Sequence, residues 1–182
     1  VVDIPLTPDF ATCESCETEL FDEKNPRYFY PFTTCTQCGP RYSITKKFPF
    51  ERENTAIEVF KMCPNCLAEY KNPDDVRFHS QTNSCPNCGI QIWLKDNQGN
   101  EFKGSNKEIF EKLAEELSHG KIVALKNTAG YLLMCDATNP EAVSELRKRK
   151  RRPTKPFAVL FSGISKMQEY LEISELQIQH FK

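Results

Sequence analysis

The sequence predicts a chain of two parts, a duplicated cysteine-rich α+β module followed by part of an α/β domain. Three observations predict this architecture. Eight of the nine cysteines fall in Cys-x-x-Cys pairs, the first half of the chain repeats itself, and strand-like and helix-like segments alternate after residue 105. With 182 residues the chain has room for one domain or two small ones, and we expect it to be a piece of a longer protein.

The four cysteine pairs have the spacing of metal ligands. Eighteen residues separate the first pair from the second and the third from the fourth, and 24 residues separate the two sets. Four thiolates complete the tetrahedron that Zn²⁺ prefers and leave no position open, so the sequence predicts two structural zinc ions. The expected ligands are Cys13, Cys16, Cys35, Cys38, Cys63, Cys66, Cys85 and Cys88.

Two ways of pairing these ligands remain open. Each repeat can bind its own ion, or the pairs can interleave between repeats. We favour the first arrangement because one repeat supplies four ligands. The spacing disfavours a disulfide framework and a redox pair, so we expect a reducing, cytoplasmic compartment. Cys135 stands apart in an apolar segment, where we expect it to be a small buried hydrophobe.

An offset of 50 residues superimposes the first cysteine set on the second, which is the mark of an internal repeat. The offset also places Phe10 on Phe60, Glu19 on Glu69, Arg27 on Arg77 and Gly39 on Gly89. We expect a finger module at 1–97, with fingers at about 10–43 and 60–93, a linker at 98–105 and a second domain at 106–182. So small a module cannot fold on buried apolar surface alone, and zinc binding supplies folding energy on the order of 10 kcal/mol per site.

Other residues of the module have simpler roles. His79 lies near the ligands, but four thiolates suffice, and we assign it to packing. We expect Trp93 and the many Phe and Tyr residues to fill small cores between the fingers.

The second part shows helix and strand signals in turn. Ser105 and Glu108 form a capping box, and Gly120 is placed to stop the helix that follows it. Asn139-Pro140 begins another helix, with Asn at the N-cap and Pro at N1. The further expected elements are a buried strand at KIVALK (121–126), strands at YLLMC (131–135) and FAVLF (157–161), and a helix at ISKMQEYL (164–171).

Charge separates the two parts. Residues 1–104 carry 11 Lys or Arg and 15 Asp or Glu, a net charge of −4, whereas residues 105–182 have a net charge of +3. Eight thiolates with two Zn²⁺ make the fingers more negative still, which argues against nucleic-acid binding by that half. No stretch approaches the roughly 18 apolar residues that cross a bilayer.

Several segments together resemble one family. DFATCESCETELFD, YPFTTCTQCGPRYSI, FKMCPNCLAEY and RFHSQTNSCPNCG are similar to the paired zinc fingers of HypF-type carbamoyltransferases, the [NiFe]-hydrogenase maturation proteins. The segment that contains KIVALK, YLLMC and FAVLF resembles the start of that family's YrdC-like domain. The resemblance implies a fold of mixed class (α+β / α/β), a double four-cysteine zinc-finger module followed by a partial YrdC-like α/β domain.

The resemblance also implies a function. Such proteins use ATP and carbamoyl phosphate to make a carbamoyl adenylate, and they transfer the carbamoyl group to the C-terminal cysteine of the partner HypE. Their full chain adds an acylphosphatase-like domain and a C-terminal ATPase-like domain. The present chain is therefore expected to be inactive alone, with the zinc module as a rigid spacer.

In YrdC-like domains a Lys-x-Arg at a helix end, followed by Lys-Pro, helps to bind nucleotide phosphates. The matching positions here are Lys150, Arg152 and Lys155. The resemblance adds Lys126, the lysine that opens the family's glycine-containing segment. A guanidinium can grip phosphate oxygens in pairs, and Lys supplies a point charge. Arg147, Lys148 and Arg149 are expected to face solvent.

Two other functions remain open. One is carbamoyl transfer to the oxygen of a small molecule by an enzyme of the same architecture. The other is a nucleic-acid-binding zinc regulatory protein in which the six consecutive basic residues at 147–152 contact phosphates.

Overall fold

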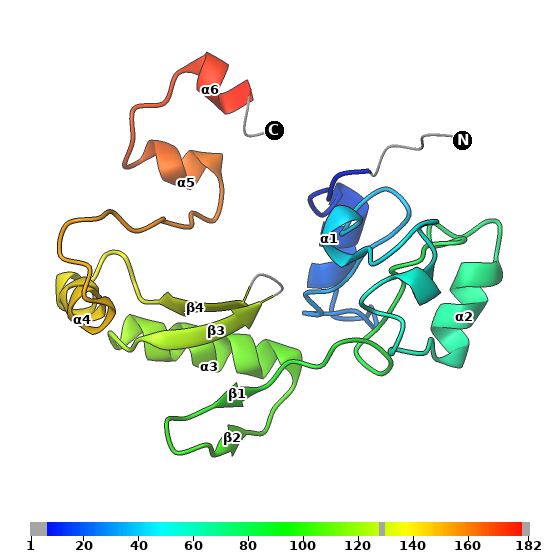
Figure 1. Cartoon of the computed structure of the whole chain (residues 1–182), viewed down its shortest axis with the longest axis horizontal. Helices are drawn as coiled ribbons and strands as arrows, with labels where there is room; N and C mark the ends of the chain where they lie inside the picture. The colour runs from blue at the N-terminus through cyan, green and yellow to red at the C-terminus, as the bar shows by residue number, and fades with distance from the viewer. Residues whose placement is uncertain (1–6, 128–129, 180–182) are drawn as a thin grey trace. The chain divides into compact units, whose positions relative to one another are not determined.

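The computed structural model describes residues 7–127 and 130–179 (Figure 1). The chain divides into two compact units, residues 1–115 and 116–182, and the division falls inside helix α3 (Asn106–Ser118). The domain bounds expected from the sequence, with a linker at 98–105, stay a prediction. No helix of the described ranges combines the length and hydrophobicity needed to cross a membrane.

The first unit holds the two fingers, a short hairpin and most of one helix. Its elements are α1 (Glu14–Phe21), the 3-10 turns η1 (Tyr42–Ile44) and η2 (Arg52–Asn54), α2 (Pro64–Lys71), β1 (Leu94–Lys95), β2 (Glu101–Phe102) and α3 (Asn106–Ser118). The hairpin pairs β1 with β2 in antiparallel register, and β2 lies within the segment 98–105 where the sequence predicts a linker.

Both fingers are built on the same local plan. A cysteine is the N-cap of each eight-residue helix, Cys13 before α1 and Cys63 before α2, and the next cysteine of the pair lies in the first helical turn. After each helix the chain turns through a residue with positive φ, Phe29 at 51° and His79 at 56°. These two residues are 50 positions apart, so the repeat extends to a backbone conformation that non-glycine residues rarely adopt.

The predicted aromatic core between the fingers is wrong. Tyr30 is the one fully buried aromatic side chain among the described residues, and Trp93 is 59% exposed. The interior is polar instead, because the cysteine clusters and hydrogen bonds hold this small module together. Its buried polar residues are Arg27, Thr33, Thr34, Asn54, Thr55, Arg77, Ser80, Thr82, Asn83 and Ser84.

The predicted ends of α3 and the predicted start of the next helix are confirmed, whereas the helix expected at 164–171 ends at Gln168. Glu108 Oε2 accepts the backbone N–H of Ser105 at 2.7 Å, and the Glu108 N–H donates to Ser105 Oγ at 3.3 Å, so the predicted capping box of α3 is confirmed. Gly120 ends that helix at φ +75°, as expected for a C-terminal glycine. The Asn139 side chain accepts the N–H of Ala142 and caps the helix that follows.

Beyond the end of α3, the described residues of the second unit form one hairpin and three helices. Its elements are β3 (Val123–Asn127), β4 (Gly130–Met134), α4 (Pro140–Lys150), α5 (Ile164–Gln168) and α6 (Glu175–Gln179). The two strands are antiparallel, from Val123 opposite Met134 to Asn127 opposite Gly130.

The strands expected at 121–126 and 131–135 are present as β3 and β4, but the expected burial of the first and the strand expected at 157–161 are wrong. The central residues of β3 are exposed rather than buried, because a two-stranded sheet has little to cover its faces. Residues 157–161 form no strand, and Leu160 is 95% exposed. An apolar run becomes a strand only when a neighbouring strand accepts its backbone hydrogen bonds, and none of the described residues pairs with it.

Candidate metal centres

The eight paired cysteines gather in two clusters, one in each finger. Within each cluster the four Sγ atoms lie within 4.8 Å of one another, and the grouping is sequential rather than interleaved. Three Sγ–Sγ distances in the first cluster are 3.7, 3.8 and 3.6 Å, and the corresponding distances in the second are 3.8, 3.8 and 3.6 Å. A Zn²⁺ tetrahedron with Zn–S bonds of about 2.3 Å separates its sulfurs by about 3.8 Å, so both clusters fit zinc.

All nine cysteines lie in the described part of the chain and are free thiols. The Sγ separations in the clusters far exceed a disulfide bond of about 2.05 Å. Cys135, the ninth, is half-buried just after β4. His79 is outside both clusters, and its ring packs on Phe78 and Tyr70 with centroids 4.3 and 5.1 Å away, which agrees with a packing role.

Each cluster contains a thiol with a lowered pKa and a thiol with a raised pKa. A hydrogen bond from the Cys16 backbone lowers the pKa of Cys13 to about 7, whereas burial raises the pKa of Cys16. In the second cluster burial opposes ionisation of Cys88, but backbone hydrogen bonds, first that of Cys63, bring its pKa down to about 7. Burial raises the pKa of Cys66, the counterpart of Cys16. A zinc ion ionises all four coordinated thiols, and its charge then offsets the cost of burying them.

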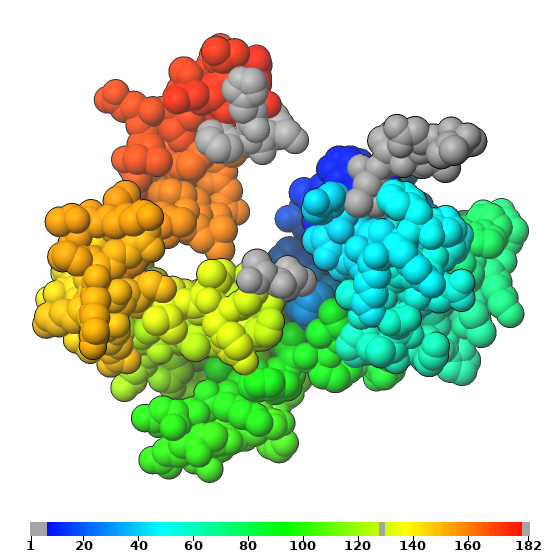
Figure 2. All heavy atoms as spheres, viewed as in Figure 1, coloured from blue at the N-terminus to red at the C-terminus, as the bar shows by residue number. Residues whose placement is uncertain are grey.

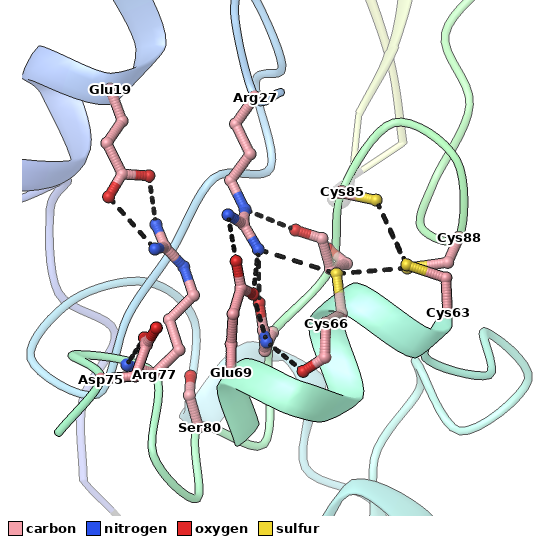
Figure 3. A network of polar contacts seen from close by, with 12 residues as sticks. Glu19, Arg27, Cys63, Cys66, Glu69, Asp75, Arg77, Ser80, Cys85 and Cys88 are labelled. Carbon is pink, nitrogen blue, oxygen red and sulfur yellow. Dashed lines mark hydrogen bonds and ion pairs between the residues drawn. The ribbon is translucent and has the colours of Figure 1, made fainter. Parts of the chain in front are cut away.

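Arg27 of the first finger reaches into the second finger (Figure 3). Its guanidinium grips Glu69 with two hydrogen bonds, 2.9 Å from Nη1 and 2.5 Å from Nη2. Nη2 also lies 3.6 Å from Cys66 Sγ, and Nε donates to the Ser84 carbonyl at 3.0 Å. The side chain is 3% exposed, so a buried cation lies directly against the second sulfur cluster.

Arg77 of the second finger makes the mirror set of contacts. It pairs with Glu19 of the first finger at 3.1 and 2.5 Å, and its Nη2 lies 4.0 Å from Cys16 Sγ. Its Nε donates to the Thr34 carbonyl at 3.0 Å. Each partner is 50 positions from its counterpart around Arg27, so an approximate twofold relation joins the fingers through crossed arginines. Spacing identified the equivalent residues but gave no sign that they cross.

Arg52 is a residue that sequence reasoning missed. It follows the first finger, and its guanidinium donates to the carbonyls of Phe60, Gln81 and Asn83 at 2.6 to 3.1 Å. Burial lowers the pKa of Arg52. These bonds fasten the segment between the cysteine sets to the second finger. A single arginine at the start of a 3-10 turn gives no periodic signal that would reveal the role.

The predicted phosphate-binding residues lie on β3, at the end of α4 and in the loop that follows. Lys126 on β3 donates to the Asn127 carbonyl at 3.0 Å, and its Nζ lies 5.5 Å from the centre of the Tyr131 ring. Lys150 is the last residue of α4 and is exposed, as is Lys155 in the loop. Figure 2 shows α4 and this loop, in yellow to orange, at the surface.

Arg152 occupies the most enclosed position of the four. Its Nη2 donates to the Pro156 carbonyl at 3.2 Å, and its guanidinium carbon lies 5.5 Å from the centre of the Phe157 ring. Among the residues described, its buried Nε has no hydrogen-bond acceptor. The loop starts at Arg151, which ends α4 in the left-handed conformation at φ 49°.

The expectation that Arg147 faces solvent is wrong. The side chain is half-buried, and its Nη1 donates to the carbonyls of Arg152 and Lys155 at 3.2 and 3.1 Å. Its guanidinium carbon lies 4.7 Å from the centre of the Phe157 ring. The loop turns back over the helix end and offers backbone carbonyls that a cation can bind. Arg149 does lie at the surface, paired with Glu145 at 2.8 Å.

Comparisons with known proteins identify both parts. A family model described as "HypF finger" matches residues 12–45 and 62–95, which enclose the two cysteine clusters. A second model, the Sua5/YciO/YrdC family described as "Telomere recombination", matches residues 115–182. The chain is a homologue of HypF carbamoyltransferases. It carries the HypF zinc fingers followed by the start of the YrdC domain.

Curated HypF relatives match over most of this chain. Carbamoyltransferase HypF of Rhodobacter capsulatus is 47% identical over 155 residues, which are 85% of this chain and 20% of the relative. Carbamoyltransferase HypF of Synechocystis sp. is 42% identical over 174 residues, 96% of this chain and 23% of the relative. This chain therefore spans about a fifth of the length of the curated HypF proteins it matches.

Solved HypF structures share the fold. A full-length HypF in its phosphate- and nucleotide-bound form matches with a TM-score of 0.84 and 39% identity, over 96% of this chain and 22% of that one. The HypF of T. kodakarensis matches with a TM-score of 0.90 and 38% identity, over 100% of this chain and 24% of that one. The predicted fold class, a double zinc-finger module followed by a partial YrdC-like segment, is confirmed.

Proposed function

We propose that this HypF homologue is part of an ATP-dependent carbamoyltransferase of [NiFe]-hydrogenase maturation. The observation that carries the proposal is the 42–47% identity to proteins named carbamoyltransferase HypF, over 85–96% of this chain. The expected acceptor is the C-terminal cysteine of a HypE-type protein. The expected compartment is the cytoplasm, where thiols stay reduced and available for zinc.

The proposed reaction has two steps. Carbamate, released from carbamoyl phosphate by the acylphosphatase-like domain of the parent chain, attacks the α-phosphorus of ATP. Pyrophosphate leaves and carbamoyl adenylate remains. The acceptor thiolate then attacks the carbamoyl carbon, and AMP leaves with the bonding electron pair. Carbamoyl phosphate, ATP and pyrophosphate all carry phosphate charge, so the site has to neutralise concentrated negative charge.

The basic loop after α4 suits this task, and we assign it to phosphate binding with Lys126. Lys150 and Lys155 are exposed point charges on either side of Arg152. The Arg152 guanidinium is held on one side by Phe157 and Pro156, which leaves its remaining N–H groups to pair with phosphate oxygens. Its buried Nε lacks an acceptor among the described residues, which is a further reason to expect an anion there.

The zinc module has a different role in this proposal. Four cysteines per cluster leave no open coordination position, so neither zinc ion takes part in the chemistry. Crossed arginines and short helices make the two fingers one stiff block. We assign this block to the spacing and orientation of the neighbouring domains of the parent chain.

The test uses the full-length protein that contains this sequence. Carbamoyl-phosphate-dependent exchange of pyrophosphate into ATP measures adenylate formation. We expect Arg152→Ala to lower the rate about ten- to a hundredfold, the effect of losing a charge-assisted phosphate contact. Arg149→Ala removes the same charge from an exposed ion pair and is expected to change the rate little. Equal loss in the two variants would contradict the assignment.

A second measurement tests the acceptor. We expect a labelled carbamoyl group to appear on the C-terminal cysteine of HypE. The label is expected to be lost when that cysteine is replaced by alanine. Labelling of a small hydroxylated molecule instead would favour the O-carbamoyltransferase. Salt-dependent binding of duplex DNA or tRNA without carbamoyl transfer would favour the nucleic-acid-binding regulator.

A further inference from the structure

Each of the crossed arginines places its guanidinium beside the sulfur cluster of the other finger. Arg27 belongs to the first finger by sequence, yet its Nη2 lies 3.6 Å from Cys66 Sγ of the second cluster. Arg77 belongs to the second finger, and its Nη2 lies 4.0 Å from Cys16 Sγ of the first. The contacted cysteines are the two most deeply buried positions at the start of α1 and α2, each 1% exposed.

A zinc ion held by four thiolates carries a net charge of about −2, which is costly to bury. A guanidinium that donates to a coordinated sulfur spreads this charge and orients the ligand. Both arginines are fixed for the purpose. Each grips a glutamate three residues after the contacted cysteine, on the same helix, Glu69 after Cys66 and Glu19 after Cys16.

We infer that the two zinc sites are coupled in trans, because the guanidinium of each finger stabilises the zinc-bound thiolates of the other finger. Arg27 and Arg77 are positioning residues for the metal sites rather than ligands. Loss of zinc from the second cluster frees the second finger and withdraws Arg77 from the first cluster. The same coupling holds in the opposite direction, as linkage between two binding equilibria requires.

The experiment follows each cluster separately in the zinc-loaded 182-residue chain. The protein is exposed to EDTA and N-ethylmaleimide at neutral pH, and peptide mass spectrometry records how fast each cysteine is alkylated. Arg27→Gln is expected to weaken zinc binding at the second cluster about 10- to 100-fold, as for other residues that support metal ligands. The second-cluster cysteines, starting with Cys66, are then alkylated first, although the substitution is in the first finger.

Arg77→Gln is the matched variant, and it is expected to reverse the order so that Cys16 and its cluster are alkylated first. Arg41→Gln is the control for charge. Its guanidinium lies near the first cluster but donates to carbonyls of its own finger, Cys35 at 3.4 Å and Thr36 at 2.9 Å, so it is expected to leave the second cluster protected.

Arg27→Lys keeps the cation and is expected to give the same order of alkylation as Arg27→Gln, with a smaller change in rate. Arg27→Lys therefore still tests the inference if Arg27→Gln folds poorly. Faster alkylation confined to the cluster of the substituted finger would overturn the inference. Alkylation of all eight cysteines at the same rate in the Arg→Gln and the Arg→Lys variants would overturn it as well. That result would indicate a general loss of folding, which exposes both clusters equally.

Discussion

Arg27 and Glu69 form a bidentate ion pair that links the first finger to the second, with nitrogen–oxygen distances of 2.9 and 2.5 Å. The arginine side chain is 3% exposed and the glutamate side chain 24% exposed. Desolvation of Glu69 raises its pKa, but hydrogen bonds from Arg27 and Asn83 outweigh this effect, and the net pKa is lowered. The pair is therefore ionised in the folded module and spans the boundary between its two repeats.

Glu69→Gln is expected to destabilise the zinc-loaded chain by about 2 kcal/mol, because it leaves the buried Arg27 charge without its main partner. Denaturant unfolding followed by circular dichroism measures the change. Glu58→Gln is the control, since Glu58 pairs with Lys46 at 2.6 Å on the surface, where solvent screens the pair and it contributes little stability. A loss at Glu69 no larger than at Glu58 would show that the crossed pair adds no stability.

Zinc content is the simplest test of the clusters. Reduced protein is expected to hold two zinc ions per chain by inductively coupled plasma mass spectrometry, because each sulfur set fits one tetrahedral ion. Cys38→Ser is expected to lower the content and to unfold the first finger, which has no apolar core to fall back on. One zinc ion or none in carefully reduced wild-type protein would refute the two-site assignment.

Gly39→Ala is expected to cost about 1–3 kcal/mol. Gly39 has φ +90°, and an added Cβ would lie 2.5 Å from Thr34 Cγ2. Thr34 cannot move away easily, because it is buried and its hydroxyl donates to Thr82 at 2.9 Å. Gly163→Ala is the comparison, since a Cβ there meets nothing within 4 Å. Thermal unfolding of the two variants measures the difference, and similar melting temperatures would contradict the steric account.

Arg147→Ala is expected to loosen the loop at 151–157, because the Arg147 side chain binds two of its carbonyls. Hydrogen–deuterium exchange in that loop is expected to rise about tenfold, which corresponds to losing about 1.4 kcal/mol of local stability. Arg149→Ala removes an equal charge two residues further along the same helix and is expected to leave exchange unchanged. Equal exchange in both variants would mean that Arg147 does not hold the loop.

The sequence predicted the metal clusters well, because four cysteine pairs at duplicated spacing leave few ways to satisfy zinc. The offset of 50 also identified Arg27 with Arg77 and Glu19 with Glu69. It could not show which copy each side chain contacts. A repeat states which residues are equivalent, and two equivalent residues can bond within their own copies or across them.

The failures share a physical cause. Aromatic residues were expected inside, but the interior is filled by hydrogen-bonded polar groups, and Trp93 lies outside with Lys95 4.7 Å from its ring centre. Residues 157–161 have the composition of a strand but no strand partner among the described residues. Arg147 was expected to face solvent, whereas its side chain bonds backbone carbonyls of the loop after the helix, five and eight residues along the chain. In each case the outcome depends on tertiary contacts, made or missing, that a local sequence pattern does not encode.

The polar interior of the fingers has a thermodynamic consequence. Exposure of apolar surface raises the heat capacity of an unfolded chain and exposure of polar surface lowers it, so unfolding of this module is accompanied by a small heat capacity change. Its stability curve is therefore shallow in temperature, and cold weakens it little. The free zinc concentration, rather than temperature, sets the folded fraction. Each bound ion adds stability that grows with the logarithm of that concentration.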